Sequence, residues 1–137
     1  MREKLPDDRE GTTIHFTIET EKQGTVDGYL QLGHYVDGRL GEIFVKIANL
    51  PDVDAGLQAW ALLFSLALQH GVPVGALCKK FIGWHGEPSG RVSPGELVVD
   101  ADQNMPMCKS AMDLVCRVLR KRYARFAIEV EEAEGVS

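Results

Sequence analysis

TVDGYLQLGHYVDGRLGEIFVKIA, residues 25–48, carries the patterns that decide the fold. Apolar and polar residues alternate in two runs, Thr25–Val36 and Gly41–Ala48, and Asp37-Gly38 lies between them. Alternation with a period of two is typical of a strand with one buried face. Asp-Gly readily takes the positive φ angles of a tight turn. The segment therefore predicts an antiparallel β-hairpin.

A further strand is predicted just before this hairpin. Ile14, Phe16 and Ile18 alternate with polar residues, so one face of that strand is expected to be buried. Within the hairpin, Gly28 and Gly33 interrupt the second strand. Such glycines indicate a bulge or a close approach of two backbones.

From about Asp54 the apolar residues recur at helical spacing, and His70-Gly71 ends the pattern. The expected inner face consists of Leu57, Trp60, Ala61, Phe64 and Leu68. Leu62, Leu63 and other apolar residues fill much of the remaining circumference. A helix that is apolar nearly all round must be covered on more than one side. We therefore expect a homo-oligomer formed through this helix.

Two more helices are predicted, one over Val74–Phe81 and one from about Met107 to Phe126, with basic residues toward its end. A glycine-rich loop, 83–104, joins them, and Leu97-Val98-Val99 interrupts it with a strand-like run. The fold class that follows is α+β with two layers, a three-stranded antiparallel sheet packed against three helices.

The charge pattern predicts three segments. Residues 1–10 form a charged N-terminal arm, residues 11–126 form a single α+β domain, and residues 127–137 form an acidic tail that frays.

Composition restricts the class of function. The net charge of −5 disfavours nucleic acid as a partner, because that affinity comes mainly from neutralised phosphates. No apolar run is long enough to cross a bilayer, and the charged N-terminus is unlike a signal peptide. We expect a cytoplasmic protein, in the host cytoplasm if its origin is viral. The three cysteines include no C-x-x-C pair, which predicts buried reduced thiols and no metal site.

Four groups of short motifs follow one another along the chain. They are Leu5-Pro6-Asp7; Asp27-Gly28-Tyr29-Leu30 with Asp37-Gly38-Arg39 and Gly41-Glu42-Ile43-Phe44; Ser65-Leu66-Ala67-Leu68-Gln69 with Gly71-Val72-Pro73; and Glu87-Pro88-Ser89-Gly90. Their order and spacing resemble the C-terminal domain of adenosylcobalamin-dependent, class II ribonucleotide reductases. The resemblance covers roughly residues 2–119 and includes a closing helix that begins near Lys109–Asp113. It implies the fold of that domain, here as a stand-alone small protein.

The chain departs from the family in ways that bear on function. His85-Gly86 stands where the family usually has an arginine and an aromatic residue, and the segment 91–104 is longer than its counterpart. Radical nucleotide reduction also needs a barrel larger than this chain, a cysteine inside it, a reducing cysteine pair and a cobalamin pocket. The cysteines here match no catalytic position of the family. The resemblance therefore implies the domain without the reaction, and we expect no enzymatic activity and no cofactor.

The loop from Gly83 to Arg91 is the predicted ligand site, because it joins aromatic, imidazole, carboxylate, hydroxyl and guanidinium groups on flexible backbone. These groups, which can stack on a base and clamp a phosphate, belong to Trp84, His85, Glu87, Ser89 and Arg91. A basic rim of Lys79, Lys80 and Lys109 is expected around them, and Lys46 is a further candidate on a strand face. A structural turn that separates two helices fits this loop equally well.

Two functions follow from these observations. The first is a non-catalytic, homo-oligomeric module that binds a nucleotide-like, phosphate-bearing small molecule and regulates or sequesters it. The second is a protein-interaction or accessory subunit that works beside a ribonucleotide reductase and has no ligand of its own. Hydrolase and nuclease functions are disfavoured, because no nucleophile elbow or metal-binding strand motif is present.

Overall fold

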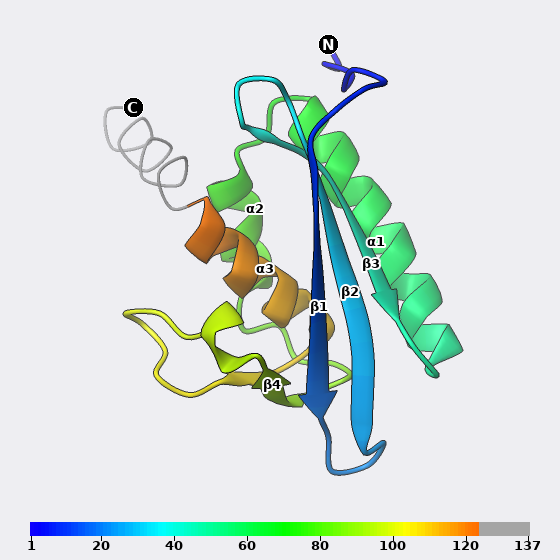
Figure 1. Cartoon of the computed structure of the whole chain (residues 1–137), viewed down its shortest axis with the longest axis vertical. Coiled ribbons are helices and arrows are strands. Elements are labelled where there is room, and N and C mark those ends of the chain that lie inside the picture. Colours follow the sequence, from blue (N-terminus) through cyan, green and yellow to red (C-terminus); the bar gives the residue numbers. More distant parts are fainter. Residues whose placement is uncertain (124–137) are drawn as a thin grey trace. The chain divides into compact units, whose positions relative to one another are not determined.

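The computed structural model describes residues 1–123 (Figure 1). Along the chain the elements are β1 (Gly11–Glu19), β2 (Thr25–His34), β3 (Leu40–Ile47), α1 (Pro51–Gln69), α2 (Val74–Phe81), β4 (Gly90–Ser93), the 3-10 turn η1 (Gly95–Leu97), β5 (Met107–Cys108) and α3 (Ala111–Arg122). The strands form one sheet in the order β3-β2-β1-β4-β5, and the pairs β2–β3, β1–β4 and β4–β5 are antiparallel. The α+β class is confirmed.

The prediction of a three-stranded sheet was wrong, because the sheet has five strands. β4 comes from the glycine-rich loop, and β5 comes from the predicted start of the last helix. β4 has four residues, of which only Val92 is buried, and β5 has two. Strands this short contain no full period of alternation, so their pattern does not stand out. The strand-like run Leu97-Val98-Val99 is instead the end of η1 and the residues that follow it.

The chain divides into two compact units. One consists of Met1–Phe16 with Asp27–Val72, and the other of Thr17–Val26 with Pro73–Ser137. The first unit contains β3, α1 and most of β2. The second contains α2, α3, β4 and β5.

In the first unit the predicted hairpin is confirmed. β2 and β3 pair in a regular register until a bulge at Gly33/His34. The backbone N–H of Arg39 donates to Asp37 Oδ1 across the turn, and Gly38 has a φ of 90°. Gly28 lies against Phe16, so closely that a Cβ at Gly28 would fall 2.4 Å from the Phe16 ring. The two glycines thus serve as the sequence predicted, one beside a bulge and one at a close approach.

Helix α1 runs alongside β3 (Figure 1). Three of its polar side chains contact the backbone of β3. Ser65 Oγ accepts a hydrogen bond from the Ile43 N–H at 2.9 Å, and Gln69 Nε2 donates to the Gly41 carbonyl at 3.0 Å. Asp54 Oδ1 accepts from the backbone N–H of Ile47 at 2.8 Å. These side chains therefore bind backbone groups of β3 that have no partner in a neighbouring strand.

The opposite face of α1 is apolar and exposed. The predicted inner face is confirmed in part, because Leu57, Ala61 and Phe64 are buried. Trp60 and Leu68, which were predicted to lie on the same face, are only half-buried. Leu62 and Leu63, however, are 62% and 67% exposed, whereas Ser65 and Gln69 are below 10%. The usual distribution of polar and apolar residues on a helix at a protein surface is partly reversed here.

The N-terminal arm predicted over residues 1–10 is attached to the first unit. The Glu3 N–H donates to the Gln69 carbonyl at 2.7 Å, and Arg9 forms an ion pair with Glu42 at 2.8 Å. The Leu5 side chain lies over Gly41. These contacts give the charged arm a defined path.

In the second unit α2 has the predicted bounds, but α3 begins later than predicted. Ser110 is its N-cap, and its hydroxyl accepts from the Asp113 N–H at 3.0 Å. Met107 and Cys108, which the sequence analysis placed in this helix, form β5 instead. A serine followed three residues later by an acidic residue is a common helix start, so the cap fixes the boundary. The predicted end at Phe126 and the acidic tail lie outside the described residues.

The three cysteines are free and buried, as predicted. A hydrogen bond with Cys78, together with burial, raises the pKa of the Cys116 thiol. Burial also raises the pKa of Cys108, to about 11. Among residues 1–123, no helix has the length and hydropathy needed to cross a membrane.

Candidate functional site

A pocket of about 930 Å³ in the second unit brings together five of the nine predicted site residues. These are His85, Glu87, Ser89, Arg91 and Lys109. The turn between β1 and β2 contributes further polar side chains to the lining, Lys22 and Gln23 among them, and the segment before β5 contributes Met105. Pockets that hold small molecules commonly have volumes of about 300–1,000 Å³.

Three cations of this pocket, Lys22, Arg91 and Lys109, are exposed. Their side chains form no hydrogen bond or ion pair with any residue in the described part of the chain. The carboxylates of the lining are Glu19, Glu21 and Glu87. The pocket thus contains both signs of charge, with cationic groups that are available to a ligand.

The pairing of β1 with β4 sets the position of Arg91. In the register Arg91 lies opposite Glu19, and Gly90 precedes it with a φ of 153°. A Cβ at Gly90 would fall 1.9 Å from the Glu19 carbonyl oxygen, so only glycine permits this approach. Gln23 reaches from the β1–β2 turn and donates to Glu87 at 3.1 Å. The turn and the predicted loop therefore form one site.

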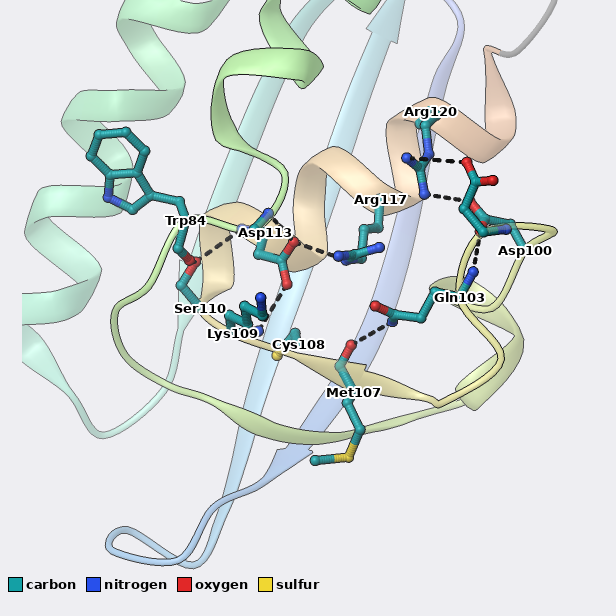
Figure 2. A network of polar contacts seen from close by, with 12 residues as sticks. Trp84, Asp100, Gln103, Met107, Cys108, Lys109, Ser110, Asp113, Arg117 and Arg120 are labelled. Atoms are coloured by element: carbon teal, nitrogen blue, oxygen red, sulfur yellow. Dashed lines mark hydrogen bonds and ion pairs between the residues drawn. The ribbon is translucent and has the colours of Figure 1, made fainter.

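A buried carboxylate, Asp113, holds the loop and the start of α3 together (Figure 2). It is 1% exposed. Asp113 Oδ1 accepts from the Gly83 N–H at 2.7 Å and from Arg117 Nε at 2.8 Å, and Oδ2 accepts from the Lys109 N–H at 2.8 Å. One side chain thus fixes the backbone at both Gly83 and Lys109.

Ser110 adds a second connection between the same two segments. Its hydroxyl donates to the Trp84 carbonyl at 2.6 Å while accepting from the Asp113 N–H. The Gly86 N–H in turn donates to the Lys109 carbonyl at 3.0 Å. We call Gly83, Trp84, Lys109, Ser110, Asp113 and Arg117 the Asp113 network. It positions Lys109 and His85 at the pocket through the backbone.

Several basic side chains near the end of α3 bind other residues of the chain and do not simply face solvent. Arg117 is 9% exposed and belongs to the Asp113 network. Arg120 pairs with Asp100 at 2.7 Å, and Lys121 donates to the Glu96 carbonyl. Burial by itself raises the pKa of Asp100, but Arg120 and two backbone N–H groups outweigh it and hold that pKa below its ordinary value. These contacts anchor the segment 91–104 to α3.

Four predicted site residues lie away from the pocket lining. Trp84 is 54% exposed, and its ring packs against that of Phe81 at a centroid distance of 5.8 Å. Lys79 and Lys80 are on the exposed side of α2. Lys46 belongs to the first unit, where it pairs with Asp54 at 2.7 Å.

Lys22, Gln23 and Asp113 were not predicted from the sequence as site residues. Lys22 and Gln23 reach the pocket because β1 pairs with β4. β4 has only four residues, so the sequence pattern does not predict this pairing. A signal for Asp113 was present, because Ser110-x-x-Asp113 has the spacing of a capping box. No group of three or more metal-ligating side chains occurs among the residues that the structure describes.

Comparison with known proteins gives the family. The model of the TSCPD domain matches residues 2–123. The chain belongs to the TSCPD domain family. No solved structure matches it.

Several relatives of this TSCPD chain are named vitamin B12-dependent ribonucleotide reductases. The protein of Streptomyces avermitilis is 31% identical over 137 residues, which cover 99% of this chain and 13% of the reductase. The protein of Rhodopirellula baltica is 33% identical over 119 residues, 86% of this chain and 10% of the reductase. The protein of Agrobacterium fabrum is 33% identical over 123 residues, which cover 89% of this chain and 9% of the reductase. The predicted resemblance is confirmed, and the TSCPD chain spans about a tenth of these relatives.

Proposed function

We propose that this TSCPD chain is a binding module without catalytic activity, and that its pocket holds a nucleotide-like, phosphate-bearing small molecule. The observation that carries the proposal is the group of three exposed cations, Lys22, Arg91 and Lys109, around one pocket and without partners among the described residues. Its role would be to regulate or sequester that molecule, and its working form a homo-oligomer.

The chemistry of the lining supports a phosphate. A guanidinium such as that of Arg91 forms paired hydrogen bonds with phosphate oxygens, and an ammonium acts as a point charge beside them. The Ser89 hydroxyl and the His85 ring add donors. Although the whole chain is acidic, a pocket can concentrate a local potential of the opposite sign.

The carboxylates of the pocket support a nucleoside over a bare phosphate. Glu19, Glu21 and Glu87 repel an anion at their own positions but accept hydrogen bonds from ribose hydroxyls and base amino groups. Glu87 already accepts from Gln23, so it is held in place. We infer that the phosphate lies toward Arg91 and Lys109.

Two considerations support a non-catalytic role. The relatives named as reductases are about ten times as long as the region that they share with this chain. In addition, the thiol of Cys108, which lines the pocket, is buried with its pKa raised to about 11, and this suppresses the reactive thiolate.

Calorimetric titration with ADP, adenosine and inorganic phosphate tests the proposal. We expect ADP to bind more tightly than adenosine or phosphate. Arg91→Gln should weaken ADP binding about 10- to 150-fold, because a hydrogen bond to a charged group contributes about 1.5–3 kcal/mol. Lys80→Gln is the matched control, since it removes a cation outside the pocket lining. No binding of ADP, or equal losses in both variants, would refute the proposed site.

A second candidate function is an accessory subunit that works beside a ribonucleotide reductase. The observation in its favour is that 99% of the chain aligns with one short region of such a reductase. Immobilised TSCPD chain would be mixed with a purified vitamin B12-dependent reductase. Stable capture, together with no response to ADP in calorimetry, would favour this alternative over the ligand-binding module.

A further inference from the structure

An exposed stripe along the middle of α1 consists of apolar residues. The stripe consists of Ala55, Gly56, Ala59, Leu62, Leu63 and the half-buried Leu66, with Asp52 before it and His70 after it. No aspartate, glutamate, lysine or arginine occurs between Ala55 and Val72. Helices at a protein surface normally place polar residues on this side.

The burial of the polar side chains explains why the stripe lacks them but does not explain its leucines. Asp54, Ser65 and Gln69 bind the backbone of β3, so the polar residues of α1 face inward. Leu62 and Leu63 are nevertheless more than 60% exposed in the single chain. Large apolar side chains left together on a surface are typical of an interface.

Side-chain size changes along the stripe in a regular way. The half nearer the N-terminus has Ala55, Gly56 and Ala59, and the half nearer the C-terminus has Leu62, Leu63 and Leu66. The position of a Cβ on Gly56 has no atom within 4 Å, so the space above it is open. One half of the stripe therefore offers room that side chains of the size found in the other half can fill.

Charge changes along the same direction. Asp52 is exposed near the N-terminal end of the stripe, and it forms no ion pair with any of the described residues. The other end has His70 and the guanidinium of Arg2, which donates to Gln69 at 2.6 Å. A parallel pair of such helices would place acid against acid, whereas an antiparallel pair places each acid beside a basic group.

From these two gradients we propose that α1 pairs with α1 of a second copy of this chain, antiparallel, about a two-fold axis at the level of Ala61. This arrangement places Gly56 opposite Leu66, Ala59 opposite Leu63 and Asp52 opposite His70 of the other copy. The interface is isologous, so Gly56 and Ala59 of each copy face Leu66 and Leu63 of the other. The inference deepens the homo-oligomeric part of the proposed function and does not depend on the ligand.

A groove beside the stripe enlarges the apolar surface. It has a volume of about 820 Å³, and its lining combines the apolar residues Phe44, Ala59, Leu62 and Leu66 with charged residues such as Arg9 and Glu42. Phe44 is 45% exposed. Because a helix of 19 residues is only about 28 Å long, the groove supplies contact area that the helix alone lacks.

Sedimentation of size-exchanged variants tests the pairing. We expect the wild-type chain to sediment with the mass of two chains, or of a larger even number. Ala59→Leu should halve the mass, because it fills the space that Leu63 of the other copy occupies. Adding Leu63→Ala to the same chain should restore the wild-type mass. Val36→Leu, which changes an exposed apolar residue outside α1, is the control that should leave the mass unaltered.

Crosslinking determines the direction of the pairing. Residues 52 and 70 of one helix are about 27 Å apart, so cysteines there cannot join within a chain. Under mild oxidation the double variant Asp52→Cys/His70→Cys should give a covalent dimer, and Asp52→Cys alone should not. The reverse result would show a parallel pair. A wild-type chain of single mass, or an Ala59→Leu variant of unchanged mass, would overturn the proposal.

The failure of this inference is distinguishable from that of the proposed ligand. The pocket belongs to the second unit and α1 to the first. Monomeric Ala59→Leu should therefore still bind ADP in calorimetry if the pocket proposal holds. A dimer that binds no ADP would leave the pairing intact and refute only the ligand.

Discussion

Replacing Asp113 by alanine should cost the chain a large part of its stability. The substitution removes the acceptor of the Gly83 N–H, the Lys109 N–H and Arg117 Nε at one time. A buried donor left without an acceptor costs about 1–3 kcal/mol. Removing one partner of a buried ion pair costs about 3–5 kcal/mol. Because these losses overlap at one side chain, we expect about 4 kcal/mol in total, a large share of the roughly 5–15 kcal/mol that stabilises a domain.

Urea unfolding followed by tryptophan fluorescence measures this cost. Asp113→Asn has nearly the same volume and retains one acceptor oxygen, so its cost should be smaller, about 1–3 kcal/mol. Arg117→Met leaves both backbone N–H groups bound and should also cost less than Asp113→Ala. An Asp113→Ala variant within about 0.5 kcal/mol of the wild type, the usual range for surface changes, would refute the assigned role of the network.

Three further outcomes follow from single contacts. Burial by itself raises the pKa of Asp54, but a backbone N–H and the Lys46 ammonium outweigh it and hold that pKa below its ordinary value of 3.8. The ionised group therefore stabilises the fold above that pH, and the contribution is lost as pH falls through the lowered pKa. Lys46→Met should weaken this acid dependence in denaturation midpoints measured against pH, and an unaltered profile would contradict it. Ser65→Ala should cost about 1–3 kcal/mol and speed amide exchange at Ile43, because the Ile43 N–H loses its acceptor; unchanged exchange would exclude the contact. With a pKa of about 11, only about one Cys108 thiol in a thousand is ionised at pH 8, so Cys108 should react with iodoacetamide far more slowly than a free thiol. Rapid labelling of Cys108, measured by mass spectrometry, would argue against its buried position.

Local patterns predicted the parts of the fold that local interactions determine. The hairpin follows from alternation around Asp37-Gly38, and the bounds of α2 follow from Pro73 before it and glycine after it. The class α+β follows from these elements. Gly28 and Gly33 were predicted as sites of a bulge or a close backbone approach, because a glycine inside a strand indicates such a site even when the neighbouring segment is unknown.

Contacts between distant segments determine the rest, and they escaped prediction. β4 exists because Gly90 can approach Glu19, more than seventy residues earlier in the chain. Lys22 enters the pocket through that same pairing. Ser65 faces inward because its hydroxyl accepts a hydrogen bond from the backbone N–H of Ile43 in β3. The helical pattern of α1 alone does not predict this contact. Most of the predicted site residues that line the pocket, such as His85 and Arg91, lie in one continuous loop.

The polar contacts of α1 with β3 have a consequence for self-assembly. The outer strands of the sheet are β3 and β5. An open outer strand is a template on which foreign strands add, which leads to aggregation. Ser65, Gln69 and Asp54 occupy that template on β3, and β5 offers only two residues. These contacts and the shortness of β5 therefore leave little open strand edge in the described part of the chain to which a foreign strand could add.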